Sequence, residues 1–569
     1  MSDQPHDDFS ENEDGLEMAP TGVTRRELFR IGNVLALPVL FGGVRARAEG
    51  AVNAEAAMGP LTPGPQIYQS IGVEPIINCH GTFTIIGGSV ERPEVRAAMD
   101  AASKYYVQMD ELADAVGQRL AELTGAEWGM VSAGCAAGLK HVTAACVTGG
   151  NPEKLVRIPD LTGFEKTEII IPRSSRNVYD HAVRNIGVTV ITVDTPEELE
   201  RAINPRTAMI YITSGGQPSN PLSLEAVAKI AQPKNIPILC DAAAEILTIP
   251  CVHLEKGATI VAYSGGKAIC GPQCAGLLLG RKDILMSAWQ ASAPHHGPGR
   301  DNKVGREETL GMVAAVEAWV KRDHKAEWQT WLSWLDNIAK RMSTIDGVKT
   351  AVREPTGLGN RSPSLTISWN PAKLNITGEE VSEELATTKP RIALGGGGGG
   401  GRGGEADPAT TSVSVTAWMM QPGDDKVVAD RIYSVLSQKR SPKTTTTMAA
   451  PGSNLTGHWD VEIEFFSSRS QHALFIEQDG NWIKGAHRGD FTVRDLIGEV
   501  EGNDVKLRSS ERQPGDNITF TFAGTLSGNT MSGKVYMGEY LNAKFTAKRH
   551  AYSETRTTIR IPTGPPLAT

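Results

Sequence analysis

One lysine, Lys267, lies between a glycine-rich turn and a run of small and apolar residues in the stretch Val261–Ile284. Lysine is mostly a surface residue, so an amine in such surroundings is paired, shifted in pKa or covalently occupied. Asp241 ends the apolar run "PILC", where an unpaired carboxylate is costly to bury. The stretch Val131–Cys146 leads through small residues into a helical pattern, whose first backbone N–H groups are suited to a phosphate.

Taken singly, each of these three motifs has an ordinary structural explanation. Small-residue loops are commonly tight packing, and an aspartate at a strand end is commonly a cap or an ion-pair partner. Together they supply what pyridoxal 5'-phosphate (PLP) requires: a phosphate cradle, an acid for the pyridine nitrogen and an amine for a Schiff base. The sequence therefore predicts PLP as the cofactor, with Lys267 forming the Schiff base and the Ser264 hydroxyl supporting the phosphate.

From about residue 65 the chain alternates between patterns of strand and helix. The stretch 110–125 places leucine and valine on one helical face and stops at Gly125. A strand at 188–193 precedes a helix with Thr195 as N-cap and Glu198 closing a capping box. Such alternation predicts an α/β protein with a mainly parallel sheet, whose ligands bind beyond the carboxyl ends of the strands.

Several stretches carry a resemblance to a known family: "INCHGTFTIIGGSVERPEV", "SAGCAAGL", "PILCDAAAE", "YSGGKAICGPQCAGLLLGRKDI" and "KVGREETLGMVAAVE". From about residue 66 to 440 the chain resembles fold-type-I PLP-dependent enzymes related to L-seryl-tRNA(Sec) selenium transferase and D-glucosaminate-6-phosphate ammonia-lyase. The resemblance implies an aspartate aminotransferase-like fold with a PLP-binding large domain at 65–330 and a small α+β domain at 331–440. It also implies a homodimer or higher homo-oligomer, with sites near the subunit interface.

The resemblance also assigns roles to individual residues. Lys267 is implied to be the catalytic acid and base, and Asp241 the pyridinium partner. The implied phosphate-binding residues are Gly134, Cys135 and Ala136, with Ser264 in support. Arg391 is either a clamp for a substrate carboxylate or a surface arginine on a strand, and no metal ligand is predicted.

One departure from the family pattern bears on the reaction type. Relatives commonly have a Gly-His pair, with the histidine over the cofactor ring, where this chain has Ser174 and Ser175. His181, in the same segment, is interpreted as an ordinary helix residue. The reaction type therefore stays open at this stage.

The N-terminus resembles an export signal. An acidic tail is followed by "TRRELFR" (Thr24–Arg30), a short apolar run and "ARA" (Ala46–Ala48), the order of a twin-arginine signal peptide over residues 1–48. The apolar run is shorter than the roughly 20 residues that span a bilayer, so no stable membrane anchor is expected. We expect export by the twin-arginine machinery to the periplasm or beyond; the alternative is an acidic tail before a chance arginine pair.

The C-terminal part has a different pattern. After a linker at 441–455, the range 456–553 alternates apolar and polar residues, as in "HWDVEIEFF", and predicts an antiparallel β-barrel or sandwich. His472 and His487 in this range are interpreted as surface or strand histidines rather than metal ligands. Residues 49–64 are a further linker and 554–569 a tail. The run Gly395–Gly401 is interpreted as a low-complexity insertion, the alternative being a mobile loop.

Composition narrows the possible functions. The 569-residue chain has a formal net charge of -8, which gives no reason to expect nucleic-acid binding. Seven cysteines are scattered without zinc-ligand spacing and are interpreted as mostly buried thiols. They are Cys79, Cys135, Cys146, Cys240, Cys251, Cys270 and Cys274.

We expect an exported PLP-dependent lyase or transferase that acts on a small amino acid or amino sugar acid. The leading hypothesis is α,β-elimination of the ammonia-lyase type through Lys267. Selenium transfer to seryl-tRNA is disfavoured by the expected export and the negative charge. The alternatives are selenium transferase-like, racemase or aldolase chemistry on a β-hydroxy amino acid, and a non-catalytic envelope binding protein.

Overall fold

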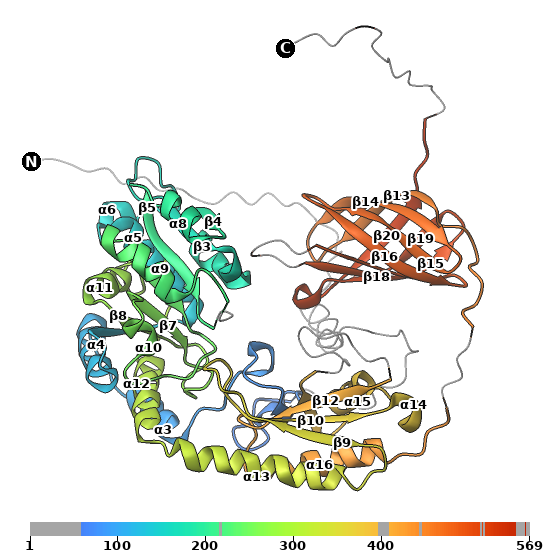
Figure 1. Ribbon diagram of the computed structural model, residues 1–569, viewed down its shortest axis with the longest axis horizontal. Helices are drawn as coiled ribbons and strands as arrows, with labels where there is room; N and C mark the ends of the chain where they lie inside the picture. Colours follow the sequence, from blue (N-terminus) through green and yellow to red (C-terminus); the bar gives the residue numbers. More distant parts are fainter. Residues whose placement is uncertain are drawn as a thin grey trace, which may run out of the picture.

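The computed structural model describes residues 59–215, 219–396, 409–442, 447–511, 515, 518–553 and 564. Figure 1 shows three regions: an α/β region with the large sheet, a smaller region below it that contains β9, β10 and β12, and a C-terminal barrel. No helix among the described residues is both long and apolar enough to cross a membrane. The expected twin-arginine segment and most of the glycine run lie outside the described residues.

A seven-stranded sheet forms the centre of the large region. Its order is β2 (Trp128–Ser132), β8 (Gly276–Gly280), β7 (Ile260–Ser264), β6 (Ile238–Asp241), β5 (Thr207–Thr213), β3 (Glu168–Pro172) and β4 (Thr189–Val193). All neighbouring pairs from β7 to β4 are parallel, whereas β8 is antiparallel to both β7 and β2. Since β2 and β7 both oppose β8, they run in the same direction. The carboxyl ends of β2, β6 and β7 therefore meet at one edge, which confirms the predicted fold class.

Helices cover both faces of this sheet. One face packs against α3 (Pro93–Ala102), α4 (Met109–Thr124), α8 (Pro196–Ala202), α9 (Leu224–Ala231) and α12 (Arg306–Lys321). The other packs against α5 (Cys135–Thr148), α6 (Pro152–Leu155), α7 (His181–Arg184) and α11 (Lys282–Gln290). Ile170 faces the first layer while Ile169 and Ile171 face the second, the alternation expected of a strand buried on both sides.

The helix boundaries follow local signals in the sequence. Gly125 ends α4 in the left-handed conformation, with φ of 73°. Thr195 caps α8 by accepting a hydrogen bond from the Glu198 N–H at 3.2 Å, while the Glu198 carboxylate accepts from the N–H of Asp194. The N-cap prediction is confirmed, although the carboxylate reaches back one residue further than a capping box requires.

The smaller region contains a three-stranded antiparallel sheet in the order β12 (Thr411–Thr416), β10 (Ser364–Trp369) and β9 (Lys349–Arg353). Its helices are α13 (His324–Met342), α14 (Pro371–Leu374), α15 (Gly378–Thr387) and α16 (Asp424–Leu436). In Figure 1, α13 runs from the large region along the lower edge of the molecule to α16.

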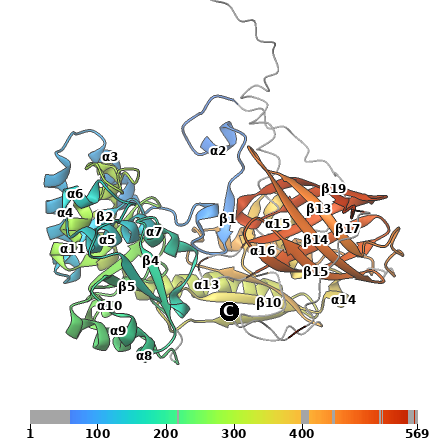
Figure 2. The ribbon, with the colours of Figure 1, turned by 90° about the horizontal axis from the view of Figure 1, so that it is seen from above.

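An early segment joins this smaller region. β1 (Ile76–Cys79), which follows the short helix α2 (Ile67–Ser70), pairs in parallel with β11 (Arg391–Leu394). Cys79 belongs to the same hydrophobic cluster as Ile392 and Leu335, and Figure 2 shows β1 apart from the strands of the large sheet. The first strand of the predicted large-domain range therefore packs with the smaller region, because its apolar residues are buried there.

The C-terminal region is a closed antiparallel barrel. Its strands are β13 (Gly457–Glu464), β14 (Arg469–Asp479), β15 (Trp482–Arg488), β16 (Val493–Glu501), β17 (Asp504–Ser510), β18 (Thr519–Ser527), β19 (Thr530–Tyr536) and β20 (Asn542–Arg549). β13 pairs with β20, which closes the barrel and leaves no edge strand. Trp459, Val461 and Ile463 alternate into the core, so the sequence prediction of a barrel or sandwich is confirmed as a barrel.

Two barrel histidines differ from the interpretation as surface residues. His472 and His487 lie on β14 and β15 as expected, but their residues are only 6% and 0% exposed. His472 Nδ1 lies 2.8 Å from His487 Nε2, and His487 Nδ1 lies 2.6 Å from the Ser509 hydroxyl. These contacts satisfy both ring nitrogens of His487 and Nδ1 of His472, whereas the buried His472 Nε2 has no hydrogen-bond partner among the described residues and lies 3.5 Å from Asp490 Oδ2.

The cysteines are free thiols, as the structure describes all seven of them. Cys79, Cys135, Cys240 and Cys251 are buried and Cys146 and Cys270 half-buried, whereas Cys274 is exposed. The interpretation as buried thiols is confirmed for most of them, with Cys274 as the exception.

Candidate active site

The turn that carries Lys267 is held in place by close backbone contacts. The N–H of Gly265 donates to the carbonyl of Ala275 at 2.8 Å, and the N–H of Gly271 donates to the carbonyl of Gly265 at 2.9 Å. A Cβ on Gly265 would lie 2.7 Å from the Ala275 oxygen, and one on Gly266 would lie 2.6 Å from the Cα of Gln273. Only glycine permits these approaches. The turn therefore fixes the backbone of the half-buried Lys267 just after β7 ends at Ser264.

The Asp241 carboxylate lies at the end of β6 and is buried. Its Oδ2 accepts a hydrogen bond from Tyr211 Oη at 2.8 Å, and its Oδ1 accepts from the N–H of Ala243 at 3.0 Å. Burial raises the pKa of Asp241, while these hydrogen bonds and the positive charge of Lys267 act in the opposite direction. Such a carboxylate favours a cationic partner, which is the property that a protonated pyridine nitrogen exploits.

The start of α5 forms the candidate phosphate site. Gly134 is its N-cap, with φ of 86° and no side-chain cap, and α5 begins at Cys135. The first backbone N–H groups of a helix and its dipole favour an anion. A Cβ on Gly276 would lie 2.5 Å from the carbonyl carbon of Gly134, so β8 approaches this turn as closely as glycine allows. Ala136 in the first turn is exposed.

The strand register relates these groups to one another. Ser132 pairs with Gly276, and Gly276 also pairs with Ser264, so the three residues form one row across β2, β8 and β7. Neighbouring strands are about 4.8 Å apart, which places Ser264 roughly 10 Å across the sheet from Ser132. Cys135 Sγ lies 3.8 Å from Asp241 Oδ1. The phosphate turn, the acid and the lysine turn therefore face one region at the carboxyl edge of the sheet.

Two residues at the carboxyl edge of the large sheet were not predicted from the sequence. Tyr211 is fully buried in β5 and orients Asp241, and its own hydroxyl accepts from Asn177 Nδ2 at 3.4 Å. Ser89 donates its N–H to the carbonyl of Gly266 at 3.1 Å, and its buried hydroxyl has no hydrogen-bond partner among the described residues. For Tyr211 the sequence did contain a signal. A tyrosine inside an apolar strand needs a hydrogen-bond partner for its buried hydroxyl, and in the structure that partner is Asp241.

The segment after β3 carries Ser174 and Ser175, where the family resemblance leads us to expect a Gly-His pair. Ser175 is buried, and its hydroxyl accepts from the N–H of Thr213 at 3.1 Å. The Ser174 hydroxyl accepts from Asn220 Nδ2 at 3.2 Å. His181 is the exposed first residue of α7, as its interpretation as an ordinary helix residue implies. The two serines therefore connect the segment after β3 to the end of β5 and to Asn220.

The barrel touches this same part of the large region. A Cβ placed on Gly515, between β17 and β18, would lie 2.8 Å from Arg176 Nη2 and 3.0 Å from Asp180 Oδ1. Arg176 follows Ser175 directly and forms an ion pair with the buried Asp180. Gly515 therefore lies against Arg176 and Asp180, in the segment that follows β3.

Arg391 begins β11, where its guanidinium contacts main-chain oxygens. Nε donates to the carbonyl of Ala386 at 2.7 Å, and Nη1 donates to the carbonyl of Glu74 at 3.1 Å. These bonds tie the end of α15 to the segment before β1. The role of Arg391 in binding a substrate carboxylate stays a prediction.

The fold and these groups together fit PLP. Burial raises the pKa of Asp241, and the positive charge of the nearby Lys267 lowers it. The N-terminus of α5 has no side-chain cap. Residues 89–308 match the family model described as Cys/Met metabolism PLP-dependent enzyme. The chain is a PLP-dependent enzyme with the aspartate aminotransferase-like fold.

The chain is similar to particular proteins of known activity and to a solved structure. The chain is 29% identical over 332 residues to D-glucosaminate-6-phosphate ammonia lyase of Salmonella typhimurium, covering 56% of this chain and 87% of that one. It is 27% identical over 340 residues to 5'-C-glycyluridine monooxygenase-decarboxylase of a Streptomyces species, covering 58% and 83%. A solved structure of D-glucosaminate-6-phosphate ammonia-lyase matches with a TM-score of 0.58 and 26% identity, over 65% of this chain and 98% of that one. These matches leave enough of this chain uncovered to include the whole C-terminal barrel.

Proposed function

We propose that this protein catalyses α,β-elimination, with release of ammonia, from a small amino acid or an amino sugar acid. The observation that carries the proposal is the meeting of Lys267, Asp241 and the α5 N-terminus at one strand edge. The similarity to an ammonia lyase, which this chain covers over 87% of its length, supports the reaction type.

Each residue of the site has a separate role in the proposed reaction. When bound, PLP supplies an electron sink for the negative charge that develops at the substrate Cα. The Lys267 amine takes the α-proton and afterwards delivers a proton to the leaving group, as a general base and then a general acid. Asp241 keeps a positive partner beside it in the buried site, and Tyr211 holds the carboxylate in place. The N–H groups at the start of α5 hold a phosphate.

We propose an amino sugar acid as the first substrate class to test. The relative's name specifies D-glucosaminate 6-phosphate, a polyhydroxylated substrate. The buried Ser89 hydroxyl has no hydrogen-bond partner among the described residues. The backbone N–H of Ser89 donates to the carbonyl of Gly266, which directly precedes Lys267 in the sequence. A hydroxyl-bearing substrate would satisfy the Ser89 hydroxyl, because a buried hydroxyl without a partner costs free energy.

We further propose that the protein is exported by the twin-arginine route and acts as a homo-oligomer. The support for export is the order of arginine pair, short apolar run and "ARA" before residue 49. Cell fractionation tests it: replacing Arg25 and Arg26 by lysine is expected to leave the protein in the cytoplasm, whereas unchanged export would contradict the proposal. Light scattering of the purified holoenzyme tests the oligomer, and a monomer at working concentration would contradict it.

Product analysis tests the reaction. Purified holoenzyme is incubated with D-glucosaminate, its 6-phosphate and a panel of D- and L-amino acids, and ammonia and 2-oxo acids are measured. We expect both products in equal amounts from at least one substrate, and none with Lys267→Ala. A mixture of D and L forms, or glycine with an aldehyde, would instead establish racemase or aldolase chemistry. Carbon dioxide would establish decarboxylation.

A non-catalytic binding protein makes the opposite prediction for the lysine. In that case Lys267→Ala would leave ligand binding and phenotype unchanged, and no substrate in the panel would turn over. Selenium transfer would show as dependence on seryl-tRNA. Either result would replace the proposed elimination.

A further inference from the structure

A cluster of two histidines and one aspartate lies on the barrel wall, away from the PLP chemistry. His458 and Asp460 flank the fully buried Trp459 on β13, so both point away from the barrel core. His550 directly follows β20, and its N–H donates to the carbonyl of His458 at 2.8 Å. Closure of the barrel between its first and last strands thus brings the three side chains together.

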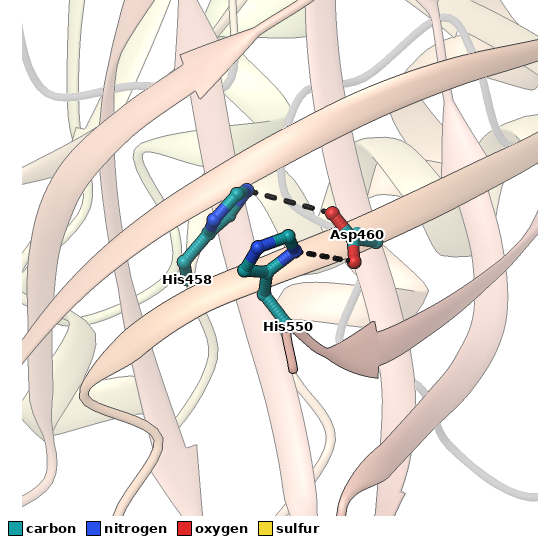
Figure 3. Close-up of side chains that lie close together, drawn as sticks. All are labelled: His458, Asp460 and His550. Atoms are coloured by element: carbon teal, nitrogen blue, oxygen red, sulfur yellow. Dashed lines mark hydrogen bonds and ion pairs between the residues drawn. The ribbon is translucent and has the colours of Figure 1, made fainter. Parts of the chain in front are cut away.

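Figure 3 shows both imidazole rings directed toward the same carboxylate. His550 Nδ1 lies 2.8 Å from Asp460 Oδ2, and His458 Nε2 lies 3.5 Å from Asp460 Oδ1. One ligand atom from each residue lies within 4.8 Å of the other two. Metal–ligand bonds of about 2.0–2.2 Å place tetrahedral ligand atoms roughly 3.3–3.6 Å apart, so small side-chain movements bring these atoms to that spacing.

Aromatic contacts hold the two rings in place. The ring centroids of His458 and His550 are 4.2 Å apart in a stacked arrangement, and His458 also stacks on Phe475 at 4.6 Å. The rings of His550 and Tyr552 form an edge-to-face contact, with centroids 4.7 Å apart. Pre-oriented ligands lose little conformational entropy on binding an ion.

The polar atoms of the cluster are only partly satisfied. His458 Nε2 is buried and has no hydrogen-bond partner among the described residues. A buried nitrogen without a partner is costly, and an ion bound there would satisfy it.

We propose that His458, Asp460 and His550 bind one divalent transition-metal ion of the zinc, cobalt, nickel or copper class on the outer wall of the barrel. Two imidazole nitrogens and one carboxylate oxygen match the ligand preferences of these ions. Mg²⁺ and Ca²⁺ take mainly oxygen ligands and are not expected to bind here. Three protein ligands leave at least one coordination position for water or an anionic ligand.

Zinc binding to the tag-free holoenzyme tests the proposal. Equilibrium dialysis against Zn²⁺ compares the unaltered chain with Asp460→Asn and His550→Gln, and His181→Ala serves as the control that removes a surface histidine elsewhere. Asp460 and His550 have side chains that are 54% and 31% exposed, so these replacements leave the barrel core intact. We expect both variants to bind one Zn²⁺ fewer per chain, or to bind it at least about 10–100-fold more weakly, the loss seen even for outer-shell partners.

Cobalt supplies a second readout that does not depend on enzyme activity. Co²⁺ at the site is expected to give visible absorption bands in the unaltered chain and in His181→Ala, and these bands are expected to be absent from the two cluster variants. Circular dichroism establishes that each variant is folded. Equal Zn²⁺ stoichiometry and affinity in all four proteins would overturn the proposal, as would the failure of the unaltered chain to bind Zn²⁺ at micromolar concentration.

Discussion

The strand edge of the large sheet and the wall of the barrel both assemble chemical groups from distant parts of the chain, but by different rules. In the large sheet, parallel strands end at one edge, so Gly134, Asp241 and Lys267 meet there although each motif follows a different strand. In the barrel, His458 and His550 meet because β13 pairs with β20. The first rule operates on strand ends that a sequence reveals, whereas the second depends on closure and register.

The largest effect is expected from removing the charge at the strand edge. Asp241→Asn is expected to lower turnover on the order of 10²–10³-fold, because a neutral amide cannot stabilise a protonated partner in a buried site. Steady-state kinetics measures the effect, and Asp100→Asn, which alters an exposed ion pair with Lys104, is the control. Full activity in Asp241→Asn would separate the carboxylate from the chemistry.

A smaller effect is expected from crowding the phosphate turn. A Cβ on Gly276 would lie 2.5 Å from the Gly134 carbonyl carbon, so Gly276→Ala must displace the start of α5. We expect the dissociation constant for PLP to rise on the order of tenfold, which corresponds to about 1.4 kcal/mol. Fluorescence titration of the apoprotein with PLP measures it. Gly357→Ala, where no atom lies within 4 Å of the added Cβ, should bind PLP normally; equal affinity in both variants would place the phosphate elsewhere.

Tyr211→Phe tests a positioning residue at the same edge. Loss of its hydroxyl removes a 2.8 Å hydrogen bond that lowers the pKa of Asp241. We expect a fall in kcat of about tenfold, or about 1.4 kcal/mol, close to the lower end of the usual range for a hydrogen bond to a charged group. The acid limb of the pH profile should move to higher pH, a change that a merely structural role would not produce. The control is Tyr263→Phe, because Tyr263 is equally buried, in β7, but its hydroxyl forms a hydrogen bond with Cys251.

The smallest effect on catalysis is expected from the histidine pair inside the barrel. Burial, with the charges of His472 and Arg494, lowers the pKa of His487 to about 3. The folded barrel therefore binds fewer protons than the unfolded chain below about pH 6.5, so stability is lost as the pH falls. Between pH 6.5 and 5 we expect a loss of about 1.6 kcal/mol, because the slope rises from about half of 1.4 kcal/mol per pH unit at pH 6.5 to the full value at pH 5.

Hydrogen exchange of the β14–β17 peptides at both pH values measures this loss, after correction for the free-peptide rates. His487→Gln should reduce the pH dependence while leaving turnover at pH 7 unchanged. An unaltered pH dependence in that variant would show that other groups govern the acid sensitivity of the barrel.

Much of the strand edge was predictable because its signals are local. Thr195 caps a helix, Gly125 ends one, and Asp241 follows an apolar strand, and each of these features depends on a few adjacent residues. The reversed direction of β8 was not predictable, because alternation of strand and helix does not fix strand direction. Ser89 was not predictable either, since its place depends on a contact with Gly266 across the fold.

The barrel shows the opposite balance. Alternation of Trp459, Val461 and Ile463 predicts a half-buried strand, and the structure confirms it. The same alternation gives no indication that β13 pairs with β20, so the approach of His458 to His550 could not be anticipated. The burial of His472 and His487 was likewise hidden, because a histidine on a strand is polar in the sequence whichever way it points.

Chemical mapping of the cofactor attachment tests the central claim most directly. The purified holoenzyme is reduced with borohydride, digested, and analysed by peptide mass spectrometry, with Lys256→Ala and Lys267→Ala treated in parallel. We predict that the pyridoxyl phosphate label is found on Lys267 in the unaltered chain and in Lys256→Ala, and is absent from Lys267→Ala. A label on another lysine, or no label on a protein saturated with PLP, would contradict the assignment of this strand edge as the active site.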